Sequence, residues 1–383
     1  MNIGFLSPRS DAHPGIGLDL LSGLKLYLKE KQKEAGIRMF TESVGFGGSE
    51  KEVYEKAEKL LMVDDVDILL AFIDLRVMDI LKPLLYASGK LMIVINAGAN
   101  YPINWVPQEN IIYLTLQHAF CNWLAGRTAS EQSSAEAATA TSFYDGGYLH
   151  VAAQVKGFTE RGGNIVFNFV NSEKKYDESF SVAPLTGFLE ENKQCSKLLC
   201  TFDSLPASLF YHALGKSSLN EDLHLFVSPM MLELAVLEKL PGGYPFAITG
   251  YSPWQASGAN EQNRIFTARC AANKKNANCF SLLGWEAGII IENILGNAAA
   301  DLSDGAALAG QLKDTELTGP RGQMLLDGDT HFFVTPVMKC SIAQKSADML
   351  ITEVKGVNDE WKNFVSEPTT GVVSGWTNTY LCY

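Results

Sequence analysis

Residues 2–28 read NIGFLSPRSDAHPGIGLDLLSGLKLYL and contain a strand, a loop and a helix in that order. The apolar run Ile3–Leu6 predicts a buried strand, and Pro8 ends it because proline has no backbone N–H. Leucines recur at helical spacing between Leu20 and Leu28, which predicts a helix. Ligands of open parallel sheets bind beyond the carboxyl ends of the strands, so we expect residues 7–17 to lie at a binding edge.

The same alternation of strands and helices continues along the chain. Further strands are predicted at residues 37–40, 67–72, 91–95, 111–114, 165–170, 198–202, 223–227 and 246–249. Helical patterns separate most of them, and one begins at Ser49, with Glu52 placed for a capping box. The fold class is therefore α/β with parallel sheets, and the pattern restarts near residues 113–117 as a second unit.

The last third of the chain departs from this pattern. Helices are predicted at residues 262–270, 281–295 and 304–312. Two antiparallel strands, 324–326 and 331–338, are predicted around the turn at Asp327, and another strand at 349–354. Trp361, Trp376 and Tyr380 predict that the tail packs against the body of the protein.

The composition excludes two classes of partner. The formal net charge is -12, so a nucleic-acid backbone would be repelled. No apolar run approaches the about 18 residues that span a bilayer. No signal peptide precedes the first strand, so either the protein is cytoplasmic or an export segment has been removed.

The residues that often carry metal or disulfide chemistry are dispersed. No Cys-x-x-Cys motif occurs, and the six histidines are scattered, so we expect no metal site. Cys270 and Cys279 flank a polar loop and are able to close it as a disulfide in an oxidising compartment. The alternative is that most of the seven cysteines are small buried residues.

Motifs for catalysis and cofactor binding are missing. The chain has neither Gly-x-Ser-x-Gly nor His-Glu-x-x-His. The segment before Lys216-Ser217 has Phe210 where a P-loop requires glycine, and Leu20 replaces the third glycine of a dinucleotide fingerprint. We therefore expect neither a catalytic residue nor a cofactor.

Five segments together resemble the type I periplasmic solute-binding proteins of ABC transporters, in particular the group of branched-chain amino acid receptors. They are the opening through Gly17 and Gly23, the loop 95–102, Tyr144-Asp145-Gly146-Gly147-Tyr148, Gly284-Trp285-Glu286-Ala287, and Thr318 to Asp327. Their order and spacing match the family from residue 2 to about residue 342.

The resemblance implies two Rossmann-like lobes joined by three hinge crossovers, near Leu116, Tyr251 and Asp327. Lobe 1 would comprise residues 1–115 and 252–327, and lobe 2 residues 116–251 and 328–383. The implied function is that of a monomeric receptor for an ABC importer, periplasmic or extracellular, which traps a small polar ligand (an amino acid or a related carboxylate or amide) and docks a membrane permease. The alternative is a ligand-sensing effector domain of the same fold, acting through a signalling partner; an α/β enzyme is a third, unsupported class.

The strand ends and the resemblance together place the ligand-binding residues. The candidates are Arg9, Ser10, His13, Asp74, Ala97, Gly98, Ala99, Asn100, Tyr148, Asp203, Ser228, Tyr251 and Trp254. Amino acid receptors of the family hold the carboxylate with loop hydroxyls, but residues 97–99 have none, so backbone amides would replace them. They hold the ammonium with a lobe 2 acid; after Ser228 the first acid is Glu233, and Asp203 is able to supply the charge.

Several candidates have a structural alternative. Arg9 anchors a carboxylate or lies in solvent. Tyr148 faces the cleft or covers the edge of the core. Asp74 and Asp203 each contact the ligand or cap the following helix. Trp254 stacks over the cleft or packs at the hinge, and Glu286 is expected to cap the start of its helix.

Overall fold

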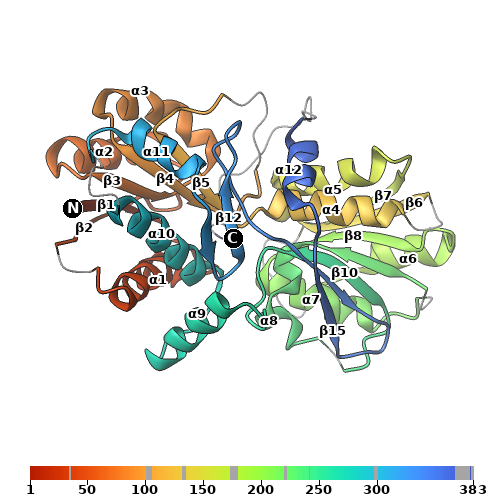
Figure 1. Ribbon diagram of the computed structural model, residues 1–383. Helices are drawn as coiled ribbons and strands as arrows, with labels where there is room; N and C mark the ends of the chain where they lie inside the picture. Colours follow the sequence, from red (N-terminus) through yellow and green to blue (C-terminus); the bar gives the residue numbers. More distant parts are fainter. Residues whose placement is uncertain are drawn as a thin grey trace.

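The chain folds into two α/β lobes that lie side by side (Figure 1). The structure is a computed structural model. It describes residues 1–33, 36–100, 106–131, 135–172, 180–219, 222–240, 242–296, 301–366 and 380. The predicted α/β class is confirmed, and each lobe is built around its own sheet.

Within the described residues, the first lobe has a five-stranded sheet in the order β2-β1-β3-β4-β5, with every pair parallel. Its strands are β1 (Asn2–Ser7), β2 (Arg38–Ser43), β3 (Ile68–Phe72), β4 (Leu91–Asn96) and β5 (Ile111–Thr115). β3, β4 and β5 are buried along their whole length, because helices cover both faces of the sheet. Ile68 and Leu70 face one helical layer, whereas Leu69 and Ala71 face the other.

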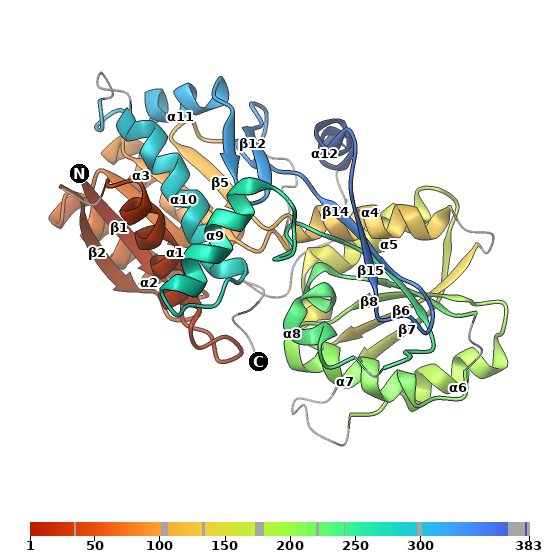
Figure 2. The same cartoon turned by 60° about the horizontal axis from the view of Figure 1, so that its bottom comes forward.

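The helices of the first lobe come from two parts of the chain. They are α1 (Ile16–Glu30), α2 (Glu50–Glu58) with its π-helical extension (Lys59–Val63), the 3-10 turn Leu75–Val77, α3 (Met78–Ser88), α9 (Glu261–Ala272), α10 (Cys279–Gly296) and α11 (Gly305–Lys313). Ser49 caps α2 as expected, its hydroxyl accepting from Glu52 N at 3.3 Å. α1 and α10 lie side by side over one face of the sheet (Figure 2).

The second lobe has a seven-stranded sheet, of the described residues, in the order β15-β14-β10-β9-β8-β6-β7. Its strands are β6 (Glu136–Ser142), β7 (Asn164–Asn171), β8 (Lys197–Thr201), β9 (His224–Val227), β10 (Ala247–Ser252), β14 (Met338–Ile342) and β15 (Met349–Glu353). The five strands from β10 to β7 are parallel, and β14 and β15 add an antiparallel edge. The sheet is thus mixed, because the chain returns to it from the first lobe.

The helices of the second lobe follow its strands. They are α4 (His118–Ser130), η3 (Asp145–Gly147), α5 (Leu149–Thr159), α6 (Ala183–Glu191), α7 (Ser204–Gly215), η4 (Pro229–Leu232) and α8 (Leu234–Leu237). α4 and α5 pack closely against each other.

A small third sheet packs against β5 and the helices of the first lobe. It contains β11 (Leu317–Gly319), β12 (Gly322–Leu326) and β13 (Phe333–Val334). The turn at Asp327 is confirmed, but the single strand predicted for residues 331–338 is wrong. Pro336 has no N–H to give to a ladder, and Thr335 N donates to Gln117 Oε1 at 3.1 Å, so β13 ends before β14 begins. The predicted lobe boundary at Asp327 stays a prediction, and this pairing favours a boundary after Val334.

The segment 284–287 does not begin a helix. α10 begins at Cys279, so the capping role expected of Glu286 is wrong. Glu286 is fully buried and pairs with Arg321, whose Nε lies 3.0 Å from both carboxylate oxygens. Arg321 also donates to Thr115 O at 2.7 Å, so the ion pair fastens α10 to the end of β5.

α10 is, in the described part of the chain, the one helix whose length and composition would allow it to cross a membrane. It is the core helix of the first lobe, since 72% of it is buried inside the protein.

The loop between α9 and α10 is held without a disulfide. Cys270 and Cys279 are both free thiols, so the disulfide that the sequence allows between them is not formed. Asn278 orders this loop instead, because its Oδ1 accepts from Phe280 N at 3.1 Å and from Ser281 N at 2.8 Å. Cys382 lies outside the described residues.

The described part of the tail packs on the body, as predicted. In α12 (Val357–Ser366), Trp361 and Phe364 are buried against Phe120 of α4, with ring centroids 5.5 and 5.6 Å apart. Figure 2 shows α12 next to the chain segments that cross between the lobes. Tyr380 is also buried, whereas Trp376 lies outside the described residues.

Candidate functional site

The carboxyl ends of the parallel strands bring polar loops together between the two lobes. β1 leads into the loop with Ser10 and His13, β8 leads into Asp203, and β9 is followed by Glu233. This is the edge at which open parallel sheets bind ligands.

In the first lobe, Ser10 shapes its own loop. Its hydroxyl accepts a hydrogen bond from His13 N at 2.8 Å, which fixes the turn that carries the imidazole. The His13 ring packs edge-on against Phe280 at the start of α10, with centroids 5.2 Å apart. The predicted residues Ser10 and His13 therefore share one rigid loop.

In the second lobe, two buried carboxylates lie together. Asp145 Oδ2 accepts from Ser142 Oγ at 2.6 Å and from Asp203 N at 3.0 Å, so the ends of β6 and β8 are joined. Asp203 occupies the residue before α7 but makes no capping bond with its side chain. Its Oδ1 accepts from Ser204 Oγ at 2.7 Å, which favours the site role over the capping alternative.

His13 reaches across from the first lobe to the second. Its Nε2 lies 3.0 Å from Ser204 Oγ and 3.7 Å from Asp203 Oδ2. Burial lowers the pKa of His13, but the hydrogen bond to Asp203 and the charges of Asp203 and Glu233 outweigh it and raise the pKa overall. A cationic His13 is thus favoured beside the acids.

The acids of the second lobe bind protons more readily than usual. Burial, together with the charge of Asp203, raises the pKa of Asp145 to about 7. Burial and the same neighbour raise the pKa of Glu233 to about 7. The second-lobe edge therefore offers hydrogen-bond acceptors and negative charge, and it disfavours another anion at this point.

Tyr380 lies in the middle of this group. Its hydroxyl donates to Glu233 Oε1 at 2.5 Å, and its carbonyl oxygen accepts from Ser10 Oγ. Its ring centroid lies 4.9 Å from that of His13 and 5.1 Å from that of Phe280. A residue of the tail therefore contacts both lobes at the site.

A second bridge between the lobes involves two predicted residues. Asn100 Nδ2 donates to Asp74 Oδ2 at 2.5 Å, and Asn100 Oδ1 accepts from Leu149 N, at the start of α5, at 3.1 Å. All three groups are buried. Asp74 thus orients Asn100, and its capping alternative stays a prediction.

The backbone of the predicted ligand loop is bonded to the Asn96 side chain and to the start of α4. Gly98 N donates to Asn96 Oδ1 at 2.8 Å, and the carbonyls of Ala97 and Gly98 accept from the first residues of α4. Gly98 has φ +67°, and an added Cβ would lie 2.8 Å from Gln117 N, so glycine is required there. Ala99 is buried beside it, and Tyr101 and Pro102 lie outside the described residues.

Four other predicted residues lie away from this group. Arg9 is exposed, pairs with Asp11 and stacks on Phe46, as its solvent alternative states. Trp254 donates to Asn263 Oδ1 at 2.8 Å and packs on Phe266, as its hinge alternative states. The remaining two are Tyr251, bonded to Thr128 on α4, and Ser228, fully buried near Phe202.

Tyr148 matches its structural alternative more closely than its predicted role. It is 4% exposed, and its ring lies edge-on to that of His150 at 5.6 Å. His150 is fully buried, with both ring nitrogens unpartnered among the described atoms.

The sequence analysis did not place four residues of the site: Asp145, Glu233, Phe280 and Tyr380. Asp145 comes shortly after β6, and Glu233 follows the 3-10 helix η4 that comes after β9, so their place beyond the ends of buried strands is the signal that would have found them. Tyr380 has no such signal, because the bond from Ser10 joins residues 370 positions apart.

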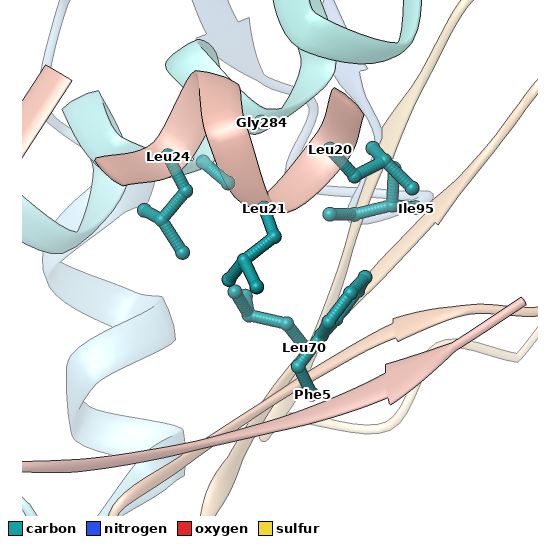
Figure 3. A pocket seen from close by; sticks show the side chains of 8 residues that line it. Phe5, Leu20, Leu21, Leu24, Leu70, Ile95 and Gly284 are labelled. Carbon is teal, nitrogen blue, oxygen red and sulfur yellow. The ribbon is translucent and has the colours of Figure 1, made fainter. Parts of the chain in front are cut away.

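An apolar cavity in the first lobe is separate from this site. It lies between α1, α10 and the sheet and is lined by Phe5, Leu20, Leu24, Leu70 and other apolar residues (Figure 3). The volume of this cavity is about 10 Å³, which is room for about one water molecule. It is therefore a packing gap and not a ligand site. No cluster suited to a metal ion occurs in the part of the chain that the structure describes.

Comparison with known proteins places this geometry in context. Residues 1–347 match the family model described as periplasmic binding protein. No curated protein matches the sequence.

Among solved structures, the chain is similar to an ABC transporter substrate-binding protein from Sphaerobacter thermophilus (TM-score 0.76, 19% identity, covering 92% of this chain and 96% of that one). It is also similar to a solute-binding protein from Rhodopseudomonas palustris in complex with 3,4-dihydroxybenzoic acid (0.72, 17%, 92% and 96%). A third is the branched-chain amino acid transporter protein LivJ from Streptococcus pneumoniae, in complex with isoleucine (0.66, 15%, 92% and 99%). The chain therefore belongs to the periplasmic binding protein family and has its two-lobed type I fold, as its sequence motifs predict.

Proposed function

We propose that the protein is the solute-binding receptor of an ABC importer and traps a small polar organic ligand between its lobes. The observation that carries this proposal is the contact of His13 with Ser204 and Asp203, which joins loops from different lobes. A ligand that contacts both loops stabilises the closed arrangement, because an open arrangement offers it only one of them. The protein binds and releases its ligand without catalysis.

The charges of the site support a ligand with two different polar ends. Asp203 and Glu233 favour an ammonium or hydroxyl donor toward the second lobe. Ser10 and a cationic His13 favour an oxygen acceptor toward the first lobe. An amino acid, or a related carboxylate or amide with a donor group, has both.

The partner and location follow from this function. The closed form docks a membrane permease, so the receptor works in the periplasm or outside the cell, as a monomer. It needs no cofactor, and its surface, with a net charge of -12, disfavours nucleic acid.

A ligand screen tests the proposal. Protein purified through unfolding, to remove bound ligand, is titrated with amino acids, amides, hydroxylated aromatic acids and sugars while its Tm is followed. A receptor gains about 2.7 kcal/mol at a ligand concentration of 100 Kd, which raises Tm by several degrees. Absence of any shift across all four classes would contradict the proposal.

Substitutions of site residues test whether the ligand binds in this cleft. His13→Ala and Asp203→Asn should weaken the ligand found in the screen by about tenfold or more, because each removes a charged hydrogen-bond partner. His212→Ala is the matched control, since His212 is exposed on α7. Equal binding by all three variants would place the ligand elsewhere.

A further inference from the structure

Tyr380 fills the space between the lobes with a residue of the chain itself. The residue is 2% exposed. Its ring meets His13 and Phe280 of the first lobe edge-on, and it lies 5.7 Å from the ring of His118, the first residue of α4. Three aromatic side chains thus enclose one phenol ring, in the geometry that aromatic pairs prefer.

The polar atoms of Tyr380 match the two ends of the site. Its hydroxyl is the donor that Glu233 accepts. Its carbonyl oxygen is the acceptor to which Ser10 donates. Tyr380 thus makes the two kinds of contact that the proposed function assigns to a ligand.

We propose that Tyr380 is an internal ligand of the interlobe cleft, and that the soluble ligand that displaces it is a 4-hydroxyphenyl carboxylate. This inference rests on the proposed function and narrows its ligand class. In Tyr380, two carbons, Cβ and Cα, separate the ring from the carbonyl. The acid 3-(4-hydroxyphenyl)propionate has the same ring, the same two-carbon arm and an acceptor oxygen at its end.

The hydroxyl decides which aromatic acids fit. Glu233 accepts from a phenol, whereas a ring without the hydroxyl leaves this carboxylate facing an apolar edge, which is costly. A carboxylate turned toward Glu233 would also meet the charge of Asp203, so the acid end points toward Ser10, which donates to the carbonyl oxygen of Tyr380. The orientation is therefore fixed by charge.

Because Tyr380 is part of the chain, it competes with a soluble ligand for the site. A group attached to the chain acts at a local concentration in the millimolar range, so it occupies the site even with modest intrinsic affinity. The apparent Kd of a soluble ligand rises by the inverse of the fraction of molecules in which the site is vacant. Removal of the phenol therefore tightens binding of the soluble acid.

Calorimetric titration with 3-(4-hydroxyphenyl)propionate tests the inference on the full chain. The Tyr380→Ala variant should bind this acid at least tenfold more tightly than the wild type. Tyr86→Ala, which removes an exposed tyrosine of α3, should bind it like the wild type. In Tyr380→Ala, 3-phenylpropionate should bind at least tenfold more weakly than the hydroxylated acid.

Three outcomes of this titration overturn the inference. Equal affinity of the wild type and Tyr380→Ala rejects the internal ligand. Equal affinity for the two acids rejects the recognition of the hydroxyl by Glu233. If Tyr380→Ala binds an amino acid but neither of the two aryl propionates, the proposed function stands and the inference is rejected.

A second measurement locates Tyr380 without any ligand. In protein labelled with 3-fluorotyrosine, the ¹⁹F resonance of residue 380 is identified by its loss in Tyr380→Phe. It should be shifted from the solvent-exposed position, move in Phe280→Ala, and return toward that position when 3-(4-hydroxyphenyl)propionate is added. A solvent-exposed resonance in the unliganded wild type rejects the internal ligand, whatever the outcome of the ligand screen.

Discussion

At the residue scale, the group of His13, Asp145 and Glu233 makes stability depend on pH. The pKa of each is raised in the folded protein. A group of this kind stabilises the fold fully below its unfolded pKa, and this contribution is lost as pH rises through its folded pKa. As pH rises, deprotonation of the two acids lowers the stability between about pH 4 and about pH 7, and deprotonation of His13 lowers it above pH 6.5. All three effects therefore have the same sign.

We therefore predict that Tm falls by roughly 5 °C between pH 5 and pH 8 at constant salt. Glu233→Gln should flatten this profile, because it removes one of the groups that titrate. Glu238→Gln, an exposed acid five residues later, should leave it unchanged. A profile equally steep in both variants would assign the effect to groups outside the site. Differential scanning calorimetry provides the measurement.

At the same scale, the sequence predicted which loops form the site better than it predicted which of their side chains make contacts there. Ser10, His13 and Asp203 follow buried strands, so strand-end logic placed them correctly near one another. Arg9 occupies the same loop but turns to solvent, because orientation within a loop depends on bonds that no pattern displays. Tyr380 was expected to pack on the body, but its place between the lobes depends on contacts remote in the chain.

At the element scale, both lobes rely on a pair of helices in close contact. In the first, an added Cβ at Gly284 of α10 would lie 1.9 Å from Leu20 O of α1, and one at Gly23 equally close to Ser281 O. In the second, Gly126 of α4 and Gly157 of α5 approach the partner helix in the same way. The backbones touch because these four residues have no side chain.

Gly284→Ala should destabilise the protein by about 2–3 kcal/mol, because the two helices must separate and the layer above the sheet must repack. Gly187→Ala on α6 is the matched control: nothing lies within 4 Å of its added Cβ. That change should stabilise the protein by about 0.5–1 kcal/mol through helix propensity. Urea unfolding measures both, and an unchanged midpoint for Gly284→Ala would contradict the prediction.

The element boundaries also show how far the apolar pattern of the sequence predicts the helices and strands. Apolar periodicity predicted most strands and helices, because burial on one face or on both leaves a period in the sequence. It failed at β13 and β14, where Pro336 and the bond from Thr335 to Gln117 divide an apolar run between two sheets. Periodicity placed Glu286 inside a helix, whereas the resemblance of residues 284–287 to a helix start led to the wrong capping role, because the partner Arg321 is remote in the sequence.

At the scale of the whole molecule, three groups of contacts join the lobes around the candidate site in the described part of the chain. His13 meets Ser204 and Asp203, Asn100 meets Leu149, and Tyr380 contacts Ser10 and Glu233. The first two are few and polar, so the buried ring of Tyr380 supplies the main apolar contact among them. Tyr380 therefore joins the two lobes through both polar and apolar contacts.

Tyr380→Ala should consequently open the unliganded protein. Small-angle X-ray scattering should show the radius of gyration rise by about 1 Å from the about 21 Å of a compact chain of this length. Saturating 3-(4-hydroxyphenyl)propionate should reverse the rise, because the soluble acid again joins Ser10 to Glu233. Tyr86→Ala should scatter like the wild type in both conditions. An unchanged radius in Tyr380→Ala would mean that His13 and Asn100 close the lobes without the phenol.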